Sequence, residues 1–288
     1  MQTRDKEKIR KAVRESYGKI AKAGNNISGI SPTISCCGGT DTSTGPAPTA
    51  SCCGGSPEVT SESLSALMGY SKQDLTSVPE GANMGLGCGN PVALASLKTG
   101  ETVVDLGSGG GFDCFLAAKQ VGGSGKVIGV DMTPDMLSKA RNNAEKMQAK
   151  NVEFRLGEIE HLPVADNSAD IIMSNCVINL SPDKLSVYRD ALRILKPGGR
   201  LAISDIVALA PLPEEIQQNL ALVSACVGGA ATIDDTRDML AQAGFQDIKI
   251  TPKDESRELI SEWAPGESKN AGDYVVSAYI EAVKPVTL

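Results

Sequence analysis

The stretch ETVVDLGSGGGF, residues 101–112, decides the fold. Residues 102–106 form a short apolar run of the kind found in a buried strand, and a glycine-rich turn follows at 107–111. Helical periodicity begins at Phe112 and continues to residue 121. A strand, a tight turn and a helix in this order predict the first βα step of an α/β sheet.

The same alternation continues along the chain. We expect further strands at residues 126–130, 152–156, 170–174 and 200–204, with helices between them. Thr133 is expected to cap one helix, and Ser181-Pro182 to open another that runs to residue 195. The tail adds helices at 214–225 and 234–242 and strands at 247–251 and 274–283, which we expect to complete the sheet and cap its carboxyl edge. The pattern predicts an α/β fold with a doubly wound, mostly parallel sheet.

Composition excludes several classes of partner. The net charge of −7 and the pI near 5.0 argue against nucleic acid and anionic membranes, and 3% aromatic residues offer few stacking platforms. The sequence shows no secretory leader and no membrane-spanning run, so we expect a cytoplasmic protein with reduced thiols. Because the chain has eight cysteines and one histidine, thiolate chemistry has more candidates than histidine-based proton transfer.

The glycine turn and the acid after the second strand indicate a ligand site. Phe112 stands where a dinucleotide G-x-G-x-x-G motif needs glycine, and no G-K-[ST] follows as in a P-loop. Asp131, 24 residues after Gly107, ends the second strand, where a carboxylate can accept both hydroxyls of a ribose. Taken alone, the turn could also be an ordinary tight βα connection.

Together with segments 157–160 and 196–199, this pattern resembles the class I S-adenosylmethionine-dependent methyltransferases. The resemblance implies a seven-stranded sheet and S-adenosylmethionine as cofactor. It also implies a set of cofactor-binding residues that contact the methionine part, the ribose and the adenine of the donor: Asp105, Gly107, Gly109, Gly111, Asp131, Met132, Glu158, Ile159 and Asn175.

Three further segments carry cysteines. Cys176 follows the fourth strand, and on its own it could be a small buried hydrophobe, a covalent nucleophile or a ligand for a soft metalloid. The motifs Gly-Cys-Gly at Cys88, Ser-Asn-Cys-Val-Ile-Asn-Leu at Cys176 and Cys-x-Gly-Gly-Ala at Cys226 together resemble the arsenite methyltransferases over roughly residues 80–235. The resemblance implies that the thiolates of Cys88, Cys176 and Cys226 hold As(III) and aim its lone pair at the sulfonium methyl. Such a reaction needs no general base.

The resemblance also suggests how the chain is organised. We expect an N-terminal helix (3–23) and a Cys/Gly-rich loop within an extension over 1–80, a Rossmann-like cofactor domain at 81–208, and a C-terminal segment at 209–288 over the arsenic site. Residues 24–57 contain 22 Gly, Pro, Ser or Thr among 34 positions, which predicts a loop rather than a packed element.

The roles of the other cysteines stay open at this level. The loop carries the repeated pair Cys36-Cys37 and Cys52-Cys53, whose thiols could capture the metalloid, close a disulfide with Cys88 during turnover, or belong to a simple tether. Cys114 is expected to be a packing residue, more buried than the proposed ligands, and His161 a surface residue.

The hypothesis is therefore an arsenite methyltransferase that takes As(III), or its thiol conjugates, and depends on a thiol reductant of the glutathione or thioredoxin type. Leu86 stands where animal and algal relatives carry tyrosine, Ala225 stands where an acid is common, and no cysteine follows Cys226. These departures leave the extent of methylation open. The alternatives are a small-molecule C- or O-methyltransferase of the quinone-precursor type and a non-catalytic thiol sensor.

Overall fold

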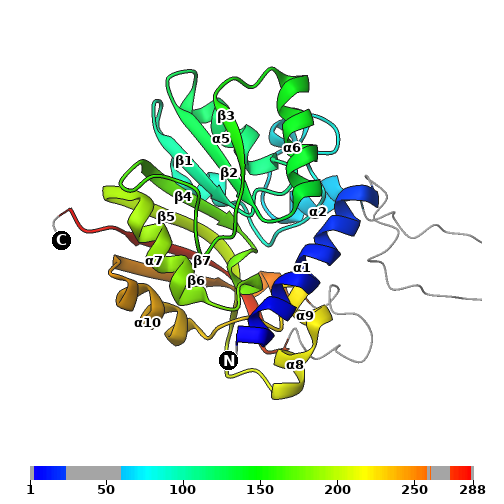
Figure 1. The fold of residues 1–288 in the computed structure, drawn as a ribbon, viewed down its shortest axis with the longest axis vertical. Coiled ribbons are helices and arrows are strands. Elements are labelled where there is room, and N and C mark those ends of the chain that lie inside the picture. The colour runs from blue at the N-terminus through cyan, green and yellow to red at the C-terminus, as the bar shows by residue number, and fades with distance from the viewer. Residues whose placement is uncertain (1–2, 24–59, 258–259, 261–272, 287–288) are drawn as a thin grey trace, which may run out of the picture.

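A computed structural model describes residues 3–23, 60–257, 260 and 273–286 (Figure 1). The loop predicted over 24–57, with its four cysteines Cys36, Cys37, Cys52 and Cys53, lies outside the described residues. Among the described residues, no helix combines the length and the apolar character needed to cross a membrane.

The centre of the molecule is one seven-stranded sheet in the order β3-β2-β1-β4-β5-β7-β6. The strands are β1 Thr102–Leu106, β2 Lys126–Asp131, β3 Val152–Leu156, β4 Ala169–Asn175, β5 Leu195–Ala208, β6 Gln246–Lys253 and β7 Val275–Val283. β1 to β5 pair in parallel, while β7 runs antiparallel between β5 and β6. The predicted fold class, an α/β doubly wound and mostly parallel sheet that the tail completes, is confirmed.

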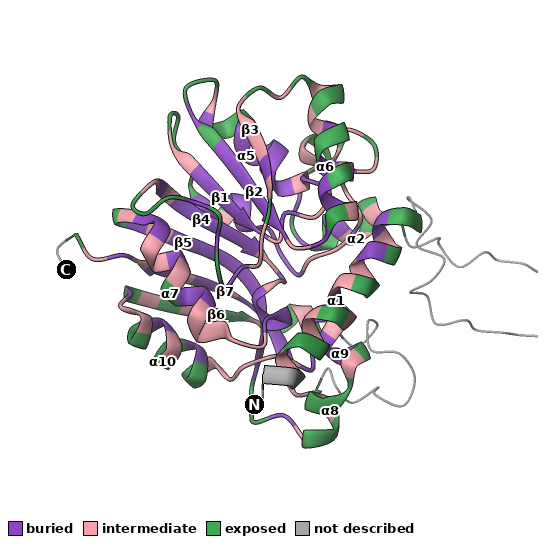
Figure 2. Ribbon diagram, in the orientation of Figure 1, coloured by how far each residue is buried: buried purple, intermediate pink, exposed green. Residues whose placement is uncertain are grey.

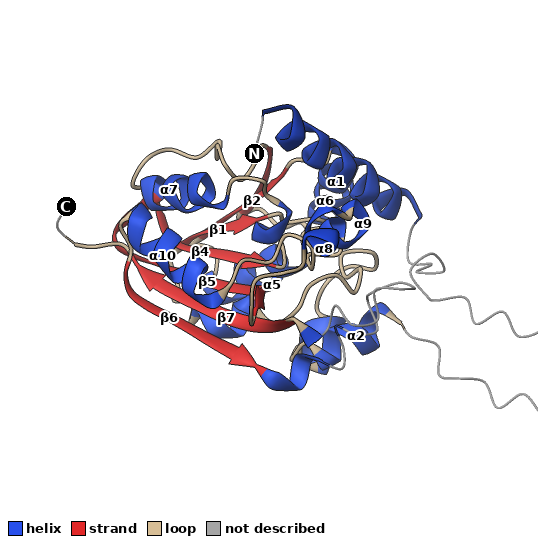
Figure 3. Ribbon diagram, turned by 90° about the horizontal axis from the view of Figure 1, so that it is seen from below, coloured by secondary structure: helices blue, strands red, loops and turns tan. Residues whose placement is uncertain are grey.

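Helices cover both faces of the sheet. They are α1 Thr3–Ala23, α2 Ser61–Leu67, α3 Lys72–Thr76, α4 Pro91–Ala95, α5 Phe112–Val121, α6 Pro134–Met147, α7 Lys184–Ile194, α8 Glu214–Gln218, α9 Leu220–Ser224 and α10 Ile233–Ala243, with 3-10 turns η1 Ile178–Leu180 and η2 Asp254–Ser256. One core cluster joins the strands to α7 and α10, and another joins them to α4, α5 and α6. Figures 2 and 3 show the buried strands between these helical layers.

The sequence order of the strands reverses at β1, whose neighbours are β2 and β4. Ligands of open α/β sheets bind outside the carboxyl ends of the strands at such a switch point. The glycine turn after β1 and Asn175 at the end of β4 both lie there. Helix α1 runs along this edge and contacts α6, η1 and α9 (Figure 1).

One expected helix start is wrong, and one correctly predicted cap lacks its side-chain hydrogen bond. Helix α7 begins at Lys184, and its cap is Asp183, whose Oδ1 accepts a hydrogen bond from the Ser186 amide at 3.2 Å. Ser181 instead follows the turn η1 and accepts from the Asp183 amide through Oγ at 3.0 Å. Thr133 occupies the N-cap position of α6, but its side chain makes no capping hydrogen bond. Helix α6 nevertheless begins at Pro134, as predicted.

Two other boundaries differ from the prediction, one because of strand pairing and one because of a helix cap. Strand β5 continues to Ala208, since it pairs with β7 as far as Val275. The helix expected at 214–225 is two short helices, α8 and α9, separated at Asn219. Asn219 has an extended backbone, and its Oδ1 accepts from the amides of Ala221 and Leu222, which starts α9 afresh.

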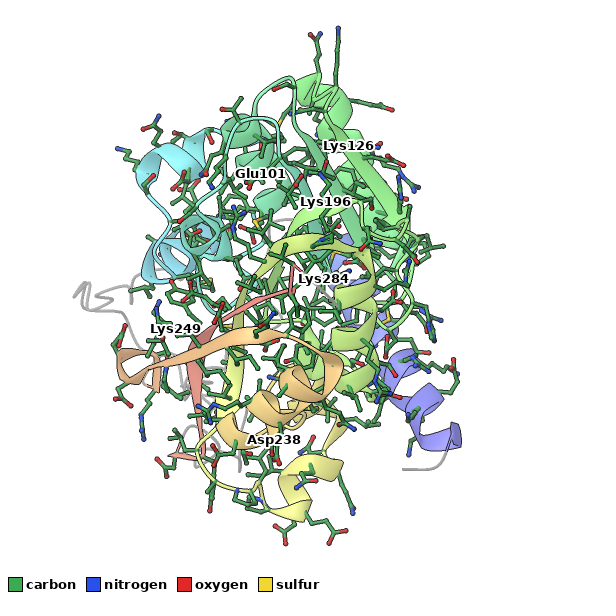
Figure 4. The ribbon with its side chains drawn as sticks, turned by 90° about the vertical axis from the view of Figure 1, so that its left-hand side faces the viewer. Glu101, Lys126, Lys196, Asp238, Lys249 and Lys284 are labelled. Carbon is green, nitrogen blue, oxygen red and sulfur yellow. The ribbon has the colours of Figure 1, made fainter. Side chains whose placement is uncertain are left out.

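The opposite edge of the sheet, at the amino ends of the parallel strands, carries ion pairs. Figure 4 labels Glu101, Lys126 and Lys196 on this side. Glu101 pairs with Arg200 at 2.7 Å and Lys196 with Asp170 at 2.8 Å, both partly exposed. Such pairs stabilise the strand ends modestly. Cys88, Cys176 and Cys226 lie at the other edge of the sheet.

Candidate active site

The turn after β1 depends on glycine. Gly107, Gly109 and Gly111 have φ angles of 69°, 50° and 90°, a region that L side chains disfavour. A Cβ on Gly107 would also lie 2.5 Å from Cγ1 of Val177, in the segment after β4. The glycine turn therefore touches the cysteine-bearing segment directly. Ser108 Oγ, in the same turn, is buried with no hydrogen-bond partner among the described residues.

Asp131 ties the turn to the end of β2. Its Oδ2 accepts from the Gly109 amide at 2.9 Å and its Oδ1 from the Thr133 amide at 2.7 Å. Burial raises the pKa of the Asp131 carboxyl, and these backbone donors oppose the rise. Each oxygen has a further lone pair with which to accept a hydrogen bond. The carboxylate can therefore accept the ribose hydroxyls that the sequence predicts at this position.

Helix α1 covers the predicted adenine region. Arg10 Nε lies 3.4 Å from Glu158 Oε2, and Arg14 Nη2 lies 3.4 Å from Glu158 Oε1. Ile159 is buried beside them, and the partly buried Met132 packs against a cluster that contains the cysteines. The amphipathic pattern of α1 predicted a helix but gave no sign of these long-range ion pairs.

Asn175 fastens the Cys88 loop to β4. Its Oδ1 accepts from the Cys88 amide at 2.9 Å, and its Nδ2 donates to the Gly89 carbonyl at 2.8 Å and to Tyr70 Oη at 3.0 Å. A Cβ on Gly87 would lie 2.7 Å from Nδ2, so glycine is required for this approach. Asn175 thus orients the first cysteine, in addition to its predicted place near the donor.

Two acids lie beneath this loop. Tyr70 Oη donates to Asp113 Oδ1 at 2.6 Å, and burial raises the pKa of Asp113 to about 6. Burial and the neighbouring charge of Asp113 raise the pKa of Asp105 as well. Tyr70 and Asp113 were not predicted as site residues, because nothing in their local sequence distinguishes them from core positions.

The structure brings the three predicted arsenic ligands together. Cys88, Cys176 and Cys226 pack in one buried cluster, although the first and the last of them are 138 positions apart along the chain. The thiols of Cys88 and Cys176 lie within 4.8 Å of each other. Cys226 Sγ donates to the Cys176 carbonyl at 2.7 Å. The trio sits at the carboxyl edge of the sheet, next to the glycine turn.

Backbone strain marks two of these cysteines. Cys176 and Cys226 have φ angles of 58° and 64°, although neither is glycine. A left-handed conformation at such residues costs on the order of 1–3 kcal/mol and persists only where the surroundings impose it. One such constraint is the Cys176 amide, which donates to the Ser204 carbonyl at 2.8 Å. The surrounding fold therefore holds the backbone of Cys176 and Cys226 in a disfavoured conformation.

The surroundings raise the pKa of two of the three thiols, those of Cys176 and Cys226. Hydrogen bonds with Cys226 and Cys88, together with burial, raise the pKa of Cys176 well above its ordinary value. At Cys226 the hydrogen bond with Cys176 lowers the thiol pKa. Burial and the charges of Asp205 and Cys88 act in the opposite direction and outweigh it, so the pKa of Cys226 is raised. Cys176 and Cys226 therefore favour the neutral thiol form when no ligand is bound.

Three further residues of the site escaped the sequence analysis. Asp205 lies within 4.8 Å of the Cys88 and Cys176 thiols, and burial raises its pKa to about 6. Tyr17 of α1 donates to the Ser224 carbonyl at 3.3 Å, and burial with the charges of Cys226 and Cys176 raises its pKa. Burial lowers the pKa of Lys184, and the negative charges of Asp205 and Cys226 oppose this shift. Only tertiary packing brings these three to the cysteines.

Two residues expected to lie outside the site do so. Cys114 is fully buried, more so than Cys88 at 6%, Cys176 at 7% and Cys226 at 4% exposure. Its Sγ also donates to Asp105 Oδ2 at 3.2 Å, and burial raises its pKa, which makes it a poor nucleophile. His161 is exposed, as predicted.

Comparison with known proteins identifies the family. Residues 97–244 match the family described as methyltransferase domain. The chain is 51% identical over 287 residues to an arsenite methyltransferase of Halobacterium salinarum, covering 98% of this chain and 68% of that protein. The chain belongs to the arsenite methyltransferase family. This family uses S-adenosylmethionine as methyl donor, in agreement with the predicted cofactor.

Two other members show how far the likeness extends. An arsenite methyltransferase of Aquipseudomonas alcaligenes is 44% identical, and the match covers 65% of this chain and 56% of that protein. The crystal structure of an arsenic(III) S-adenosylmethionine methyltransferase from Chlamydomonas reinhardtii has 32% identity and a TM-score of 0.59, over 77% of this chain and 73% of the algal one.

Proposed function

We propose that this arsenite methyltransferase family member transfers the methyl group of S-adenosylmethionine to As(III) bound by Cys88, Cys176 and Cys226. The observation that carries the proposal is the convergence of the three thiols beside the glycine turn. Family membership supports the acceptor, since the relatives are named for arsenite.

The residues around the turn fit the donor. Three left-handed glycines expose backbone, Asp131 presents a carboxylate, and Ser108 Oγ is buried without a partner among the described residues. Asp105, Gly107, Gly109 and Gly111 would hold the methionine part, Asp131 and Met132 the ribose side, and Glu158 and Ile159 the adenine. When bound, S-adenosylmethionine supplies an electrophilic methyl on a sulfonium.

The cysteines do the remaining chemistry. As arsenous acid binds, each thiol proton leaves with an arsenic-bound hydroxide as water, and three As–S bonds form. Soft thiolates suit this metalloid, and a pyramid of three of them leaves the arsenic lone pair free. That lone pair forms the As–CH₃ bond while the methyl–sulfur bond breaks and its electron pair stays with the donor's sulfur. Positioning of the two reactants supplies much of the rate.

Methylation oxidises the arsenic by two electrons, so a thiol must restore the trivalent state. We propose that a reductant of the glutathione or thioredoxin type supplies these electrons as two thiols become a disulfide. Cys36, Cys37, Cys52 and Cys53 are candidates for an internal thiol that pairs with Cys88, and these residues lie outside the described part of the chain.

The test is direct. Purified protein is incubated with methyl-labelled S-adenosylmethionine, arsenite and a thiol reductant, and the arsenicals are separated by chromatography. Label in methylated arsenic supports the proposal. Arsenite binding without label transfer would indicate a sensor, and label found only in an added quinone precursor would indicate the organic methyltransferase instead.

A further inference from the structure

A second set of donor atoms overlaps the proposed arsenic site. The thiols of Cys88 and Cys176 and a carboxylate oxygen of Asp205 all lie within 4.8 Å of one another. All three residues are at least nine-tenths buried. Cys226 does not belong to this set; its thiol is directed to the Cys176 carbonyl. Two sulfurs and one oxygen thus face the same point.

The Asp205 carboxylate is oriented for this purpose. Oδ1 accepts from Asn179 Nδ2 at 2.9 Å and from the Ile206 amide at 2.8 Å, while Oδ2 accepts from the Ile178 amide at 2.9 Å. A carboxylate offers about four lone-pair positions. Among the described residues these donors and the Asn179 backbone hold the carboxylate in one orientation, and a cation at Oδ2 would share that oxygen with the Ile178 amide. Hydrogen bonds of this kind fix the orientation of metal-binding carboxylates.

We propose that Cys88, Cys176 and Asp205 bind a thiophilic divalent cation of the Zn²⁺ type, which excludes arsenite from the two shared cysteines. Zinc accepts thiolate at ~2.3 Å and carboxylate oxygen at ~2.0–2.2 Å, so neighbouring donors of a tetrahedral site lie about 3.5–3.8 Å apart. Because each pair of donor atoms is at most 4.8 Å apart, a contraction of at most about 1.3 Å completes such a site. Rotation of the Cys88 side chain can supply it, while Asn175 and Ser277 hold the backbone amide and carbonyl of Cys88 in place.

Charge balance agrees with this occupant. Two thiolates and one carboxylate carry three negative charges, of which a divalent cation neutralises two. The positive charge of Lys184 favours the carboxylate form of Asp205 and offsets part of the third. On binding, the two thiol protons leave to solvent, as for other thiolate metal sites. As(III) has a different ligand set, because it binds three cysteine sulfurs and does not use the Asp205 carboxylate.

The probe is Co²⁺, whose absorption reports thiolate ligands in a zinc-type site. The full chain is used with Cys36, Cys37, Cys52 and Cys53 replaced by serine, so that the loop thiols cannot contribute. Under anaerobic conditions we expect one equivalent of Co²⁺ to produce thiolate-to-metal charge transfer. Added arsenite should abolish this absorption; if a separate titration shows that arsenite binds, persistence of the absorption would place Co²⁺ elsewhere and overturn the proposal.

Two variants separate the ligand sets. Asp205→Asn should lower Co²⁺ affinity by ~10-fold or more, the scale seen even for outer-shell partners, and should lower arsenite affinity by a much smaller factor, because As(III) takes three sulfurs. Cys226→Ser should instead abolish arsenite binding and leave Co²⁺ affinity unchanged, because Co²⁺ keeps its two sulfurs and one oxygen. Serine can still donate to the Cys176 carbonyl, so the backbone there is preserved.

The outcomes distinguish this proposal from the proposed function, on which only the competition with arsenite rests. Equal loss of Co²⁺ and arsenite affinity in Asp205→Asn would show that the carboxylate merely holds the segment after Cys176, and the cation site would be refuted. Asp205-dependent Co²⁺ binding in a protein that never binds arsenite would refute the arsenic site and leave the cation site standing.

Discussion

Replacing Gly107 with alanine tests whether the glycine turn and the Cys176 segment form one mechanical unit. The new methyl enters a left-handed position, φ 69°, which costs about 1–2 kcal/mol for an L residue. It would also lie 2.5 Å from Val177 Cγ1, and overpacking of this kind costs about 1–3 kcal/mol. We therefore expect Gly107→Ala to lower the free energy of unfolding by about 2–5 kcal/mol.

Gly109→Ala is the matched control. It has a similar left-handed φ of 50°, but the nearest atom to its Cβ is Met84 Cε at 3.5 Å, an ordinary contact. Only the backbone cost of about 1–2 kcal/mol should remain. Arsenite affinity should fall in Gly107→Ala, because the displaced Val177 adjoins Cys176, and stay unchanged in Gly109→Ala.

Urea unfolding of the ligand-free proteins measures these differences. The double variant Gly107→Ala with Val177→Ala should recover about 1–3 kcal/mol relative to the sum of the single changes, since the smaller side chain removes the clash. Equal destabilisation by the two glycine substitutions, or no recovery in the double variant, would refute the reasoning.

Three further predictions concern the site. Cys176→Ser should abolish methyl transfer while S-adenosylmethionine still binds, measured by label transfer and by calorimetry; unchanged turnover would remove Cys176 from the ligand set. Asp131→Ala should weaken binding of S-adenosylmethionine and leave arsenite affinity intact, and equal donor affinity would contradict the ribose contact. Asp205 titrates near 6 in the folded chain against an ordinary value of 3.8, so the folded state binds the proton more tightly. Its contribution to stability is present at low pH and is lost as pH rises from about 4 to 6, a loss of about 3 kcal/mol at 1.36 kcal/mol per unit. Asp205→Asn should remove this part of the pH dependence in urea unfolding; an unaltered slope would assign it to other groups.

Local pattern was sufficient for most of the sheet. The strands at 102–106 and 152–156 and the helix at 112–121 have the predicted bounds, because alternation of apolar runs and helical periodicity is a property of neighbouring residues. One error falls where a distant partner decides, because strand β5 is lengthened by its pairing with β7. The start of α7 is a local matter, because Asp183 rather than Ser181 caps the helix.

The sequence by itself determined the class of enzyme, because the glycine turn, Asp131 and three cysteine motifs are contiguous patterns that can be read without coordinates. Only the tertiary structure decided what surrounds the cysteines. Asp205, Tyr17 and Lys184 come from β5, α1 and α7, and nothing near them in sequence indicates a site. The parallel sheet brings the carboxyl ends of its strands to one edge, and α1 packs across that edge. Proximity between residues more than a hundred positions apart is a result of packing, which no local pattern encodes.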